Sequence, residues 1–244
     1  MIRLILNAIV VILYVISSII LMPLTWIISK INPVAGEKTI LAIMKSLFNS
    51  MMFLSGIKLT VIGEENVPKD KPVLYIGNHK SNFDTIITYA RVPGRCGYIA
   101  KDNLEKIPVL RGWMKRIHCL FLNRENTREG LKTILTAIDY IKDGVSMTIF
   151  PEGGRNKTDE PTLPFHEGSF KLSTKTGCPI IPMAISNSEH ILETHMPFIR
   201  ATHVVLQYGK PIIPDELAPE DKKFIGAYTQ KVVEQMLEDN QNYL

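Results

Sequence analysis

The chain has 244 residues, of which 45% are apolar and 21% are charged, and this balance excludes a disordered or low-complexity protein. Its 28 basic and 24 acidic side chains give a net charge of +4, and residues 1–60 hold five basic side chains against one acidic one. The excess positive charge therefore lies in a strongly apolar segment, which favours an anionic lipid surface as partner over nucleic acid. Three widely spaced cysteines without a C-x-x-C pair are typical of buried residues in a reducing compartment.

The N-terminal segment contains an uncharged run over residues 4–29 that is rich in Ile, Leu and Val. A helix needs about 20 apolar residues to cross the hydrocarbon layer, so this run predicts a membrane helix. The run is longer than the apolar region of a secretion signal, and no clear cleavage site of small residues follows it before Lys30. We expect Asn32-Pro33 to break the helix, because a proline disfavours helical backbone at the residue before it.

A second helix is predicted over residues 37–54, where apolar residues recur at steps of three and four and polar or basic residues gather on the other side. The apolar positions are Ile40, Met44, Leu47, Met51 and Leu54. Beside a membrane helix, this pattern favours contact with the membrane surface, and packing on the main domain is the alternative. Residues 1–56 are thus expected to form a membrane helix or helical hairpin plus an amphipathic helix.

From residue 57 onward, short runs of β-forming residues alternate with helical ones. Strands are expected at residues 73–76, 97–100, 119–122, 145–150, 179–185 and 204–208. Helices are expected after Asn82, at residues 128–142, after Gly168 and at residues 219–238. This alternation predicts an α/β fold with a mixed, largely parallel sheet flanked by helices. Ligand-binding residues of such sheets gather in the loops beyond the carboxyl ends of the strands.

The loop after the first of these strands contains His79 and Asp84. On one continuous helix they would point about 140° away from each other, so they can meet only if His79 lies in the turn before the helix that holds Asp84. A carboxylate bound to one ring nitrogen fixes the tautomer of the imidazole and leaves the other nitrogen as a base. The sequence offers no serine or cysteine nucleophile for this pair. The pair therefore suits removal of a proton from a substrate hydroxyl, with the substrate itself as the nucleophile. A helix cap beside a surface histidine is the alternative.

Further loops carry residues that are suited to an anionic ligand. The Gly-Gly pair that begins at Gly153 lets the backbone approach a ligand closely, and Arg155 offers a planar fork that suits a phosphate. Glu152 could anchor this arginine or a substrate hydroxyl. Arg124 and Lys101 each follow another predicted strand, and both add positive charge at the same edge of the sheet. Ordinary turns with solvated charges are the alternative for these loops.

Taken together, these blocks resemble the sequence motifs of the glycerolipid acyltransferases, among them their H-x4-D motif. The four blocks are Asn78-His79-x4-Asp84, Phe121-Leu122-Asn123-Arg124, Phe150-Pro151-Glu152-Gly153-Gly154-Arg155 and Cys178-Pro179-Ile180-Ile181-Pro182-Met183. The linking stretch over residues 163–172 also fits, and the order and approximate spacing agree across residues 70–185. Four ordered blocks are far more specific than any one of them. Gly154 departs from the pattern, because the family commonly has Thr or Ser there.

The resemblance implies transfer of a fatty acyl group from acyl-CoA or acyl-carrier protein to the sn-2 hydroxyl of 1-acyl-sn-glycerol 3-phosphate, giving phosphatidic acid. His79 is then the general base and Asp84 orients its imidazole, without an acyl-enzyme, a metal or a bound cofactor. Substrate binding falls to Arg124, Glu152, Gly153, Arg155 and Lys101, with the two arginines on the phosphate. The acyltransferase catalytic domain is then expected over residues 57–244. The basic residues after the apolar run favour the cytosolic side for this domain. A bacterial inner membrane is the expected location.

Other interpretations stay open from the sequence. The same motifs serve glycerol 3-phosphate, other lysophospholipids and acylated amino-acid lipids. An inactive lipid-binding protein could share the scaffold, although the intact H-x4-D motif argues against it. A Cys-His hydrolase would use Cys119 or Cys178, but neither cysteine follows a strand-to-helix turn. His190 and His195 lie five residues apart and lack a third metal ligand at a matching spacing.

Overall fold

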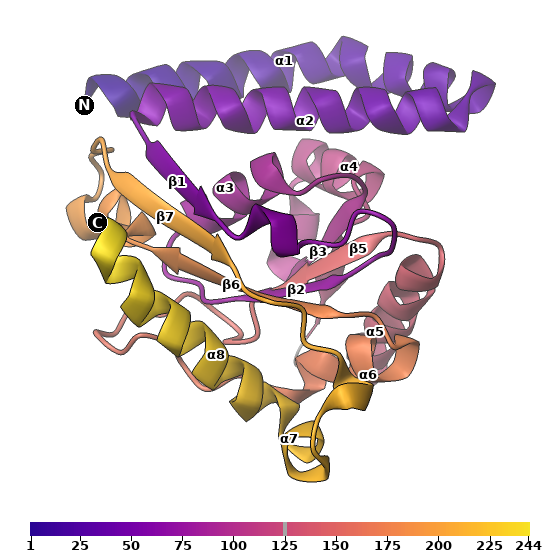
Figure 1. Cartoon of the computed structure of the whole chain (residues 1–244). Helices are drawn as coiled ribbons and strands as arrows, with labels where there is room; N and C mark the ends of the chain where they lie inside the picture. The colour runs from indigo at the N-terminus through magenta and orange to yellow at the C-terminus, as the bar shows by residue number, and fades with distance from the viewer. Residues whose placement is uncertain (124–125) are drawn as a thin grey trace.

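The computed structural model describes residues 1–123 and 126–244. The chain begins with two long helices, α1 (Ile2–Ile31) and α2 (Pro33–Ser55). The strands are β1 (Lys58–Ile62), β2 (Leu74–Gly77), β3 (Cys96–Lys101), β4 (Leu120–Leu122), β5 (Ser146–Ile149), β6 (Ile180–Ser186) and β7 (His203–Tyr208). The other helices are α3 (Phe83–Arg91), α4 (Pro108–Arg116), α5 (Thr127–Lys142), α6 (Lys171–Thr176), α7 (Pro219–Lys223) and α8 (Ile225–Asp239). Figure 1 shows α1 and α2 above α3 and α4, then the sheet, then α5, α6 and α8.

In the described part of the chain, the strands form one sheet in the order β1-β7-β6-β2-β5-β3-β4. Neighbouring strands are parallel except for β6 and β7, which confirms the predicted mixed, largely parallel sheet. β2 lies in the middle, where Leu74 is in register with Met147 of β5 and Ile180 of β6. All residues of β2 are buried, as expected for a central strand with helices on both faces.

Each face of the sheet carries its own hydrophobic core. On the face toward α1 and α2, Tyr75 of β2 packs in one cluster with Ile87 of α3 and Trp113 of α4. On the other face, Leu74 and Ile76 pack with residues of α5, α6 and α8. The alternation along β2 directs successive side chains to opposite cores, and it leaves the carboxyl end of the strand as the place where polar residues begin.

The first two helices form an antiparallel hairpin, and the predicted break at Asn32-Pro33 is confirmed. Asn32 has extended backbone, and its side chain accepts a hydrogen bond from the N–H of Ala35 at 3.0 Å, which caps the start of α2. Pro33 fits the first turn because its missing N–H would have no helical partner there. A Cβ on Gly36 would lie 2.2 Å from Oγ of Ser29, so glycine permits the close approach of the two helices.

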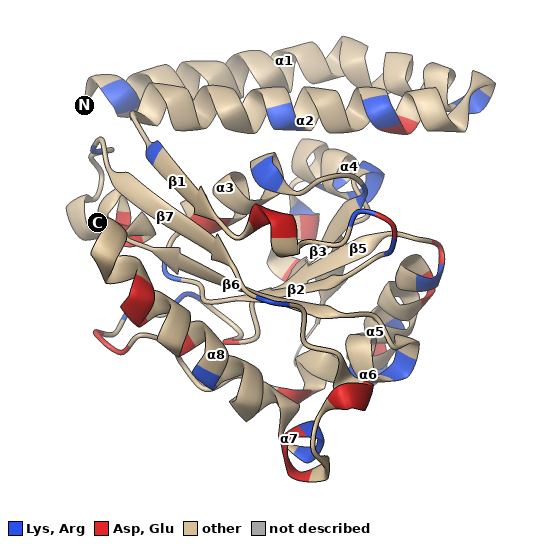
Figure 2. Ribbon diagram, in the orientation of Figure 1, with Lys and Arg blue, Asp and Glu red and all other residues tan. Residues whose placement is uncertain are grey.

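The hairpin lies along the α/β domain. Trp113 Nε1 donates a 2.8 Å hydrogen bond to Ser18 Oγ in the middle of α1, and Ile40 and Met44 of α2 are buried against the domain. Two residues of the predicted apolar face of α2 thus pack on protein, whereas Leu47, Met51 and Leu54 are only partly buried. Most apolar side chains of α1 remain exposed, and Figure 2 shows few charges along either helix.

Three other elements differ from the prediction. β1 and α4 were not predicted, and the last helix, expected over residues 219–238, is divided into α7 and α8 at Phe224. The division has a tertiary cause. Phe224 leaves the helical conformation (φ −118°, ψ 46°), and the carboxylate of Glu167 accepts hydrogen bonds from the N–H groups of Gly226 and Ala227. A remote side chain thus caps the start of α8.

Candidate active site

The site begins where β2 ends. Asn78 follows Gly77, and its side-chain amide donates to the carbonyl of Ile185 at 2.9 Å and accepts from the N–H of Ile185 at 2.8 Å. The pairing of β2 with β6 ends at Gly77 and Met183, so Asn78 bridges the two strands just beyond their ladder. This buried bridge fixes the direction in which the chain leaves the sheet.

His79 and Asp84 meet in the turn between β2 and α3. Nδ1 of His79 lies 2.8 Å from Oδ2 of Asp84, and Asp84 occupies the first turn of α3, the arrangement that their spacing required. Oδ2 also accepts hydrogen bonds from the N–H groups of Lys80 and Ser81, both at 2.8 Å. A carboxylate can only accept here, so Nδ1 carries the proton and Nε2 presents its lone pair.

The exposure of the two groups differs in the way that a base and its orienting partner require. The Asp84 side chain is fully buried, whereas the His79 side chain is 18% exposed. Among the described residues, Nε2 of His79 has no hydrogen-bond partner. The ring also packs against Phe150, which directly follows β5. The accessible nitrogen can therefore reach a substrate proton while the rest of the ring is held.

The loop after β5 fixes the backbone of His79. Glu152 accepts hydrogen bonds from the N–H of His79 at 2.6 Å through Oε1 and from the N–H of Leu163 at 2.8 Å through Oε2. The N–H of Asn156 donates to the carbonyl of His79 at 2.7 Å. Burial raises the pKa of Glu152, and the two N–H groups offset part of this effect. The carboxylate that we expected on an arginine or a substrate hydroxyl therefore binds the backbone around the histidine.

Gly153 and Arg155 occupy the same loop. Gly153 has φ +77°, a left-handed conformation that favours glycine, and its N–H donates to the carbonyl of Phe150 at 3.3 Å. Nη1 of Arg155 lies 3.1 Å from Oε1 of Glu193, and the arginine side chain is 32% exposed. The remaining nitrogens of this guanidinium have no partner within residues 1–123 and 126–244. The arginine is thus fixed by one ion pair and can still donate hydrogen bonds to a ligand.

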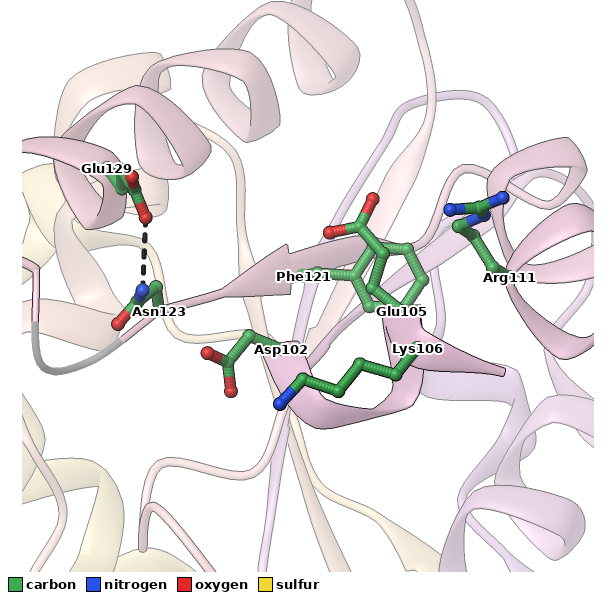
Figure 3. Close-up of a pocket in the computed structure, with 7 residues that line it drawn as sticks. All are labelled: Asp102, Glu105, Lys106, Arg111, Phe121, Asn123 and Glu129. Atoms are coloured by element: carbon green, nitrogen blue, oxygen red, sulfur yellow. Dashed lines mark hydrogen bonds between the residues drawn. The ribbon is translucent and has the colours of Figure 1, made fainter. Parts of the chain in front are cut away.

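Lys101 lies further along the same edge of the sheet. Lys101, the last residue of β3, is exposed and in register with Leu122 of β4, while Arg124 lies outside the described residues. β5 separates β3 from β2, so the end of β3 is about 10 Å from that of β2. A cavity of about 390 Å³ opens between the segment after β3, the end of β4, α4 and α5 (Figure 3). It is lined by Asp102, Glu105, Lys106, Arg111, Phe121, Asn123 and Glu129.

The sequence analysis missed three residues that hold the site: Asn156, Ser188 and Glu193. Ser188 and Glu193 come from the segment after β6 and contact the turn that carries His79. Their only sequence signal was position, because they follow the carboxyl end of a strand next to β2 in the sheet. Glu193 lies between His190 and His195 in the sequence, and the rings of these histidines are 6.2 Å apart. Its carboxylate binds the turn before α3 and Arg155.

The three cysteines are buried, and their thiols lack the properties of a nucleophile. Burial raises the pKa of Cys96 and of Cys119 to about 12, and it also raises the pKa of Cys178. Such thiols are protonated at neutral pH and shielded from substrate. This environment disfavours the Cys-His hydrolase that the sequence left open.

Comparison with known proteins places this geometry in a family. The family model described as Acyltransferase matches residues 58–186, which is more than half of the chain and includes β1 to β6. The chain belongs to the acyltransferase family. The match contains both residues of the His79–Asp84 pair and the loop after β5.

Individual relatives agree with the family. A 1-acyl-sn-glycerol-3-phosphate acyltransferase of Saccharomyces cerevisiae is 31% identical over 193 residues, 78% of this chain and 62% of the yeast protein. The protein of the same name from Borreliella burgdorferi is 28% identical over 195 residues, 80% of this chain and 78% of its own length. The alignment thus spans less than two thirds of the yeast relative.

A solved structure has the same fold along nearly the whole chain. The crystal structure of the 1-acyl-sn-glycerophosphate (LPA) acyltransferase PlsC from Thermotoga maritima aligns with a TM-score of 0.76 at 24% identity. The alignment covers 98% of each chain, so it includes the N-terminal hairpin as well as the α/β domain.

Proposed function

We propose that this acyltransferase moves a fatty acyl group from a thioester donor to the sn-2 hydroxyl of 1-acyl-sn-glycerol 3-phosphate and so forms phosphatidic acid. The observation that carries the proposal is the His79–Asp84 pair, with Nδ1 held at 2.8 Å and Nε2 directed away from its carboxylate partner. The names of the yeast and Borreliella relatives support this acceptor. The donor is acyl-CoA or acyl-carrier protein, which acts as a co-substrate.

In this mechanism Nε2 of His79 removes the proton of the acceptor hydroxyl as its oxygen attacks the thioester carbonyl. The ring becomes an imidazolium, and Asp84 stabilises the new charge through Nδ1. When the tetrahedral intermediate collapses, the C–S bond breaks and the thiolate takes up the proton from Nε2. The acceptor supplies the nucleophile, so no acyl-enzyme forms and no metal or bound cofactor enters the scheme.

The phosphate of the acceptor is assigned to the cations at the carboxyl edge of the sheet. Arg155 lies in the loop that holds His79 and has guanidinium nitrogens beyond the one that binds Glu193. Charge-assisted hydrogen bonds from a fixed guanidinium suit a phosphate. Lys101 is proposed to add positive charge from the end of β3, whose next residue, Asp102, lines the 390 Å³ cavity. Arg124 is proposed for the same role from the sequence motif alone, because it lies outside the described residues. Glu152 and Gly153 serve the same substrate by shaping the loop.

The hairpin is proposed to seat the enzyme in the membrane that contains its acceptor and product. α1 is long and apolar enough to cross a membrane, but its middle is bound to Trp113 of the domain. We infer that the hairpin lies in the membrane interface with the exposed face of α1 among the lipids. The excess of basic residues that follow α1 supports our proposal that the domain lies on the cytosolic side.

The test is transfer of a labelled acyl group from acyl-CoA or acyl-carrier protein to lysophosphatidic acid in detergent or vesicles. Wild type should make phosphatidic acid, and His79→Ala should lose about 10²–10⁴-fold in kcat. His203→Ala is the matched control, because this histidine makes a 2.8 Å side-chain bond to Thr60 between β1 and β7. If wild type transfers the acyl group to another lysolipid instead, that lysolipid replaces lysophosphatidic acid as the proposed acceptor. Failure with every acceptor would favour a lipid-binding protein on this scaffold.

A further inference from the structure

The segment after β6 returns to the turn that carries His79. Its first contact is Ser188, whose hydroxyl donates a 2.5 Å hydrogen bond to Oδ1 of Asp84. Both residues are fully buried. The three donors on Oδ2, described above, include the imidazole of His79, so Ser188 binds the opposite oxygen of the same carboxylate. The plane of the Asp84 carboxylate is therefore fixed from both sides.

The second contact is Glu193. Its Oε2 accepts a 2.6 Å hydrogen bond from the hydroxyl of Ser81, and its Oε1 accepts from the N–H of Asn82 at 2.8 Å and from Arg155 at 3.1 Å. The Glu193 side chain is 16% exposed. One carboxylate thus joins the turn between β2 and α3 to the loop after β5.

We propose that Ser188 and Glu193, together named the β6 brace, are positioning residues for the His79–Asp84 pair. Ser188 acts through Asp84, because a carboxylate that lost its donor on Oδ1 could rotate and share the donors on Oδ2. The imidazole would then tilt with it. Glu193 acts through the turn, whose Ser81 and Asn82 it holds at a fixed position relative to Arg155. For its chemical effect this inference rests on the proposed acyl transfer.

The size of the effect follows from geometry. A base must approach its proton along one line, and a misplacement of about 1 Å can cost about 10²-fold in rate. Removal of Ser188 Oγ also leaves Oδ1 of Asp84 buried without a donor. Such an unpaired oxygen is unfavourable, so the Asp84 carboxylate should rotate to regain a hydrogen bond. Removal of the Ser188 hydroxyl touches none of the substrate-binding cations, whereas Glu193 also binds Arg155. Loss of the Ser188 hydroxyl should therefore lower kcat and leave the KM values for acceptor and donor nearly unchanged.

The kinetic test compares Ser188→Ala with Ser173→Ala. Ser173 on α6 is an equally buried serine whose hydroxyl donates a 2.5 Å hydrogen bond to the carbonyl of Cys178, away from the site. We expect Ser188→Ala to lower kcat about tenfold, which is less than the roughly 10²-fold cost of a 1 Å misplacement. Both KM values should stay within about twofold of those of wild type. Ser173→Ala should retain wild-type kcat.

A double-mutant cycle shows whether Ser188 acts through Asp84. In an Asp84→Asn background, Ser188→Ala should change kcat by less than about twofold, because residues in one network are not additive. An equal loss in both backgrounds would overturn the proposal, as would a loss in Ser173→Ala as large as in Ser188→Ala. A rise confined to KM would also overturn it.

A spectroscopic measurement tests the brace without any turnover. In protein labelled with ¹⁵N-histidine, the Nδ1–H resonance of His79, assigned with His79→Gln, reports the bond to Asp84. Ser188→Ala should shift or broaden this resonance, and Ser173→Ala should leave it in place. If Ser188→Ala does not fold, Glu193→Gln carries the spectroscopic test, with a broadened resonance expected, because its kinetics also report the lost ion pair with Arg155. An unchanged resonance would refute the brace. Absence of transfer by wild type would refute only the proposed function.

Discussion

The imidazole of His79 lies flat against the ring of Phe150, with the ring centroids 4.3 Å apart and the planes 12° from parallel. Asp84 holds the edge of the same imidazole through Nδ1. The aromatic face therefore restrains tilting of the ring, while the carboxylate sets its rotation. A face-stacked ring also interacts favourably with the imidazolium that forms when the base takes up its proton.

The stack predicts a specific effect of Phe150→Leu. Leucine keeps an apolar side chain beside His79 but removes the aromatic face, which is worth about 0.5–1.5 kcal/mol beyond simple burial. We expect kcat to fall about 3- to 10-fold in the acyl-transfer assay, with little change in the KM for either substrate. Phe48→Leu is the control, because it removes another aromatic contact, the edge-on pair with Tyr89 at 5.5 Å. Full activity of Phe150→Leu would show that the stack has no part in catalysis.

The local part of the site could be predicted because His79 and Asp84 are five residues apart. A strand, a turn and the first turn of a helix bring such residues together whatever the rest of the chain does. Ser188 lies 104 residues from Asp84, and Glu193 lies 112 residues from Ser81. Their hydrogen bonds depend on the path of a loop that has no periodic pattern. Their place after a strand was therefore predictable, but these contacts were not.

The fold shows the same division between local pattern and tertiary contact. Alternating strands and helices predicted the sheet, because each element displays its own periodicity. The apolar face of α2 did not reveal whether it meets lipid or protein, since both environments favour the same side chains. Contacts between residues that are distant in sequence determine which parts of the hairpin meet protein. Examples are the burial of Met44 and the hydrogen bond from Trp113 to Ser18 of α1.

Arg155→Ala should separate binding of the acceptor from binding of the donor. A hydrogen bond to a charged group contributes about 1.5–3 kcal/mol, so loss of the guanidinium should raise the KM for the phosphorylated acceptor about tenfold or more. The KM for the acyl donor should change much less. Arg91→Ala is a matched control, because Arg91 makes an exposed ion pair with Glu64 at 2.6 Å. Equal increases in both KM values would remove the assignment of Arg155 to the phosphate.

The exposed face of α1 predicts how membrane binding can be weakened without unfolding the domain. Ile16 and Ile20 are 57% and 70% exposed, so glutamates at both positions would face the lipids and leave the contacts of Ser18 intact. We expect Ile16→Glu with Ile20→Glu to lower binding to anionic vesicles at least about tenfold, because charges are costly in the apolar layer. Flotation with vesicles measures this directly.

The control for this pair lies on the opposite side of the sheet. Leu131 and Leu135 of α5 are 55% and 51% exposed, so glutamates there add the same charge to a face that is remote from the hairpin. Vesicle binding should be retained in that variant. A similar loss in both variants would show that net charge, and not the face of α1, controls binding.

Glu152 gives the protein a pH dependence whose sign can be derived. Burial raises the pKa of Glu152 above its usual value of 4.5, so the folded protein holds this proton at pH values where the unfolded chain has released it. The contribution of Glu152 to the free energy of unfolding is therefore full below pH 4.5 and is lost as pH rises through its folded pKa. Glu152→Gln has no such proton, because its side chain is neutral throughout.

The Tm of Glu152→Gln minus that of wild type should consequently increase as pH rises between about pH 4 and pH 7. Thermal melts followed by circular dichroism at fixed detergent and salt measure this difference. Glu160→Gln is the control, because it makes the same substitution at an exposed residue of the same loop. A difference that falls with rising pH for Glu152→Gln would mean that the N–H groups of His79 and Leu163 outweigh burial. The carboxylate would then stabilise the turn around His79 mainly in its ionised form.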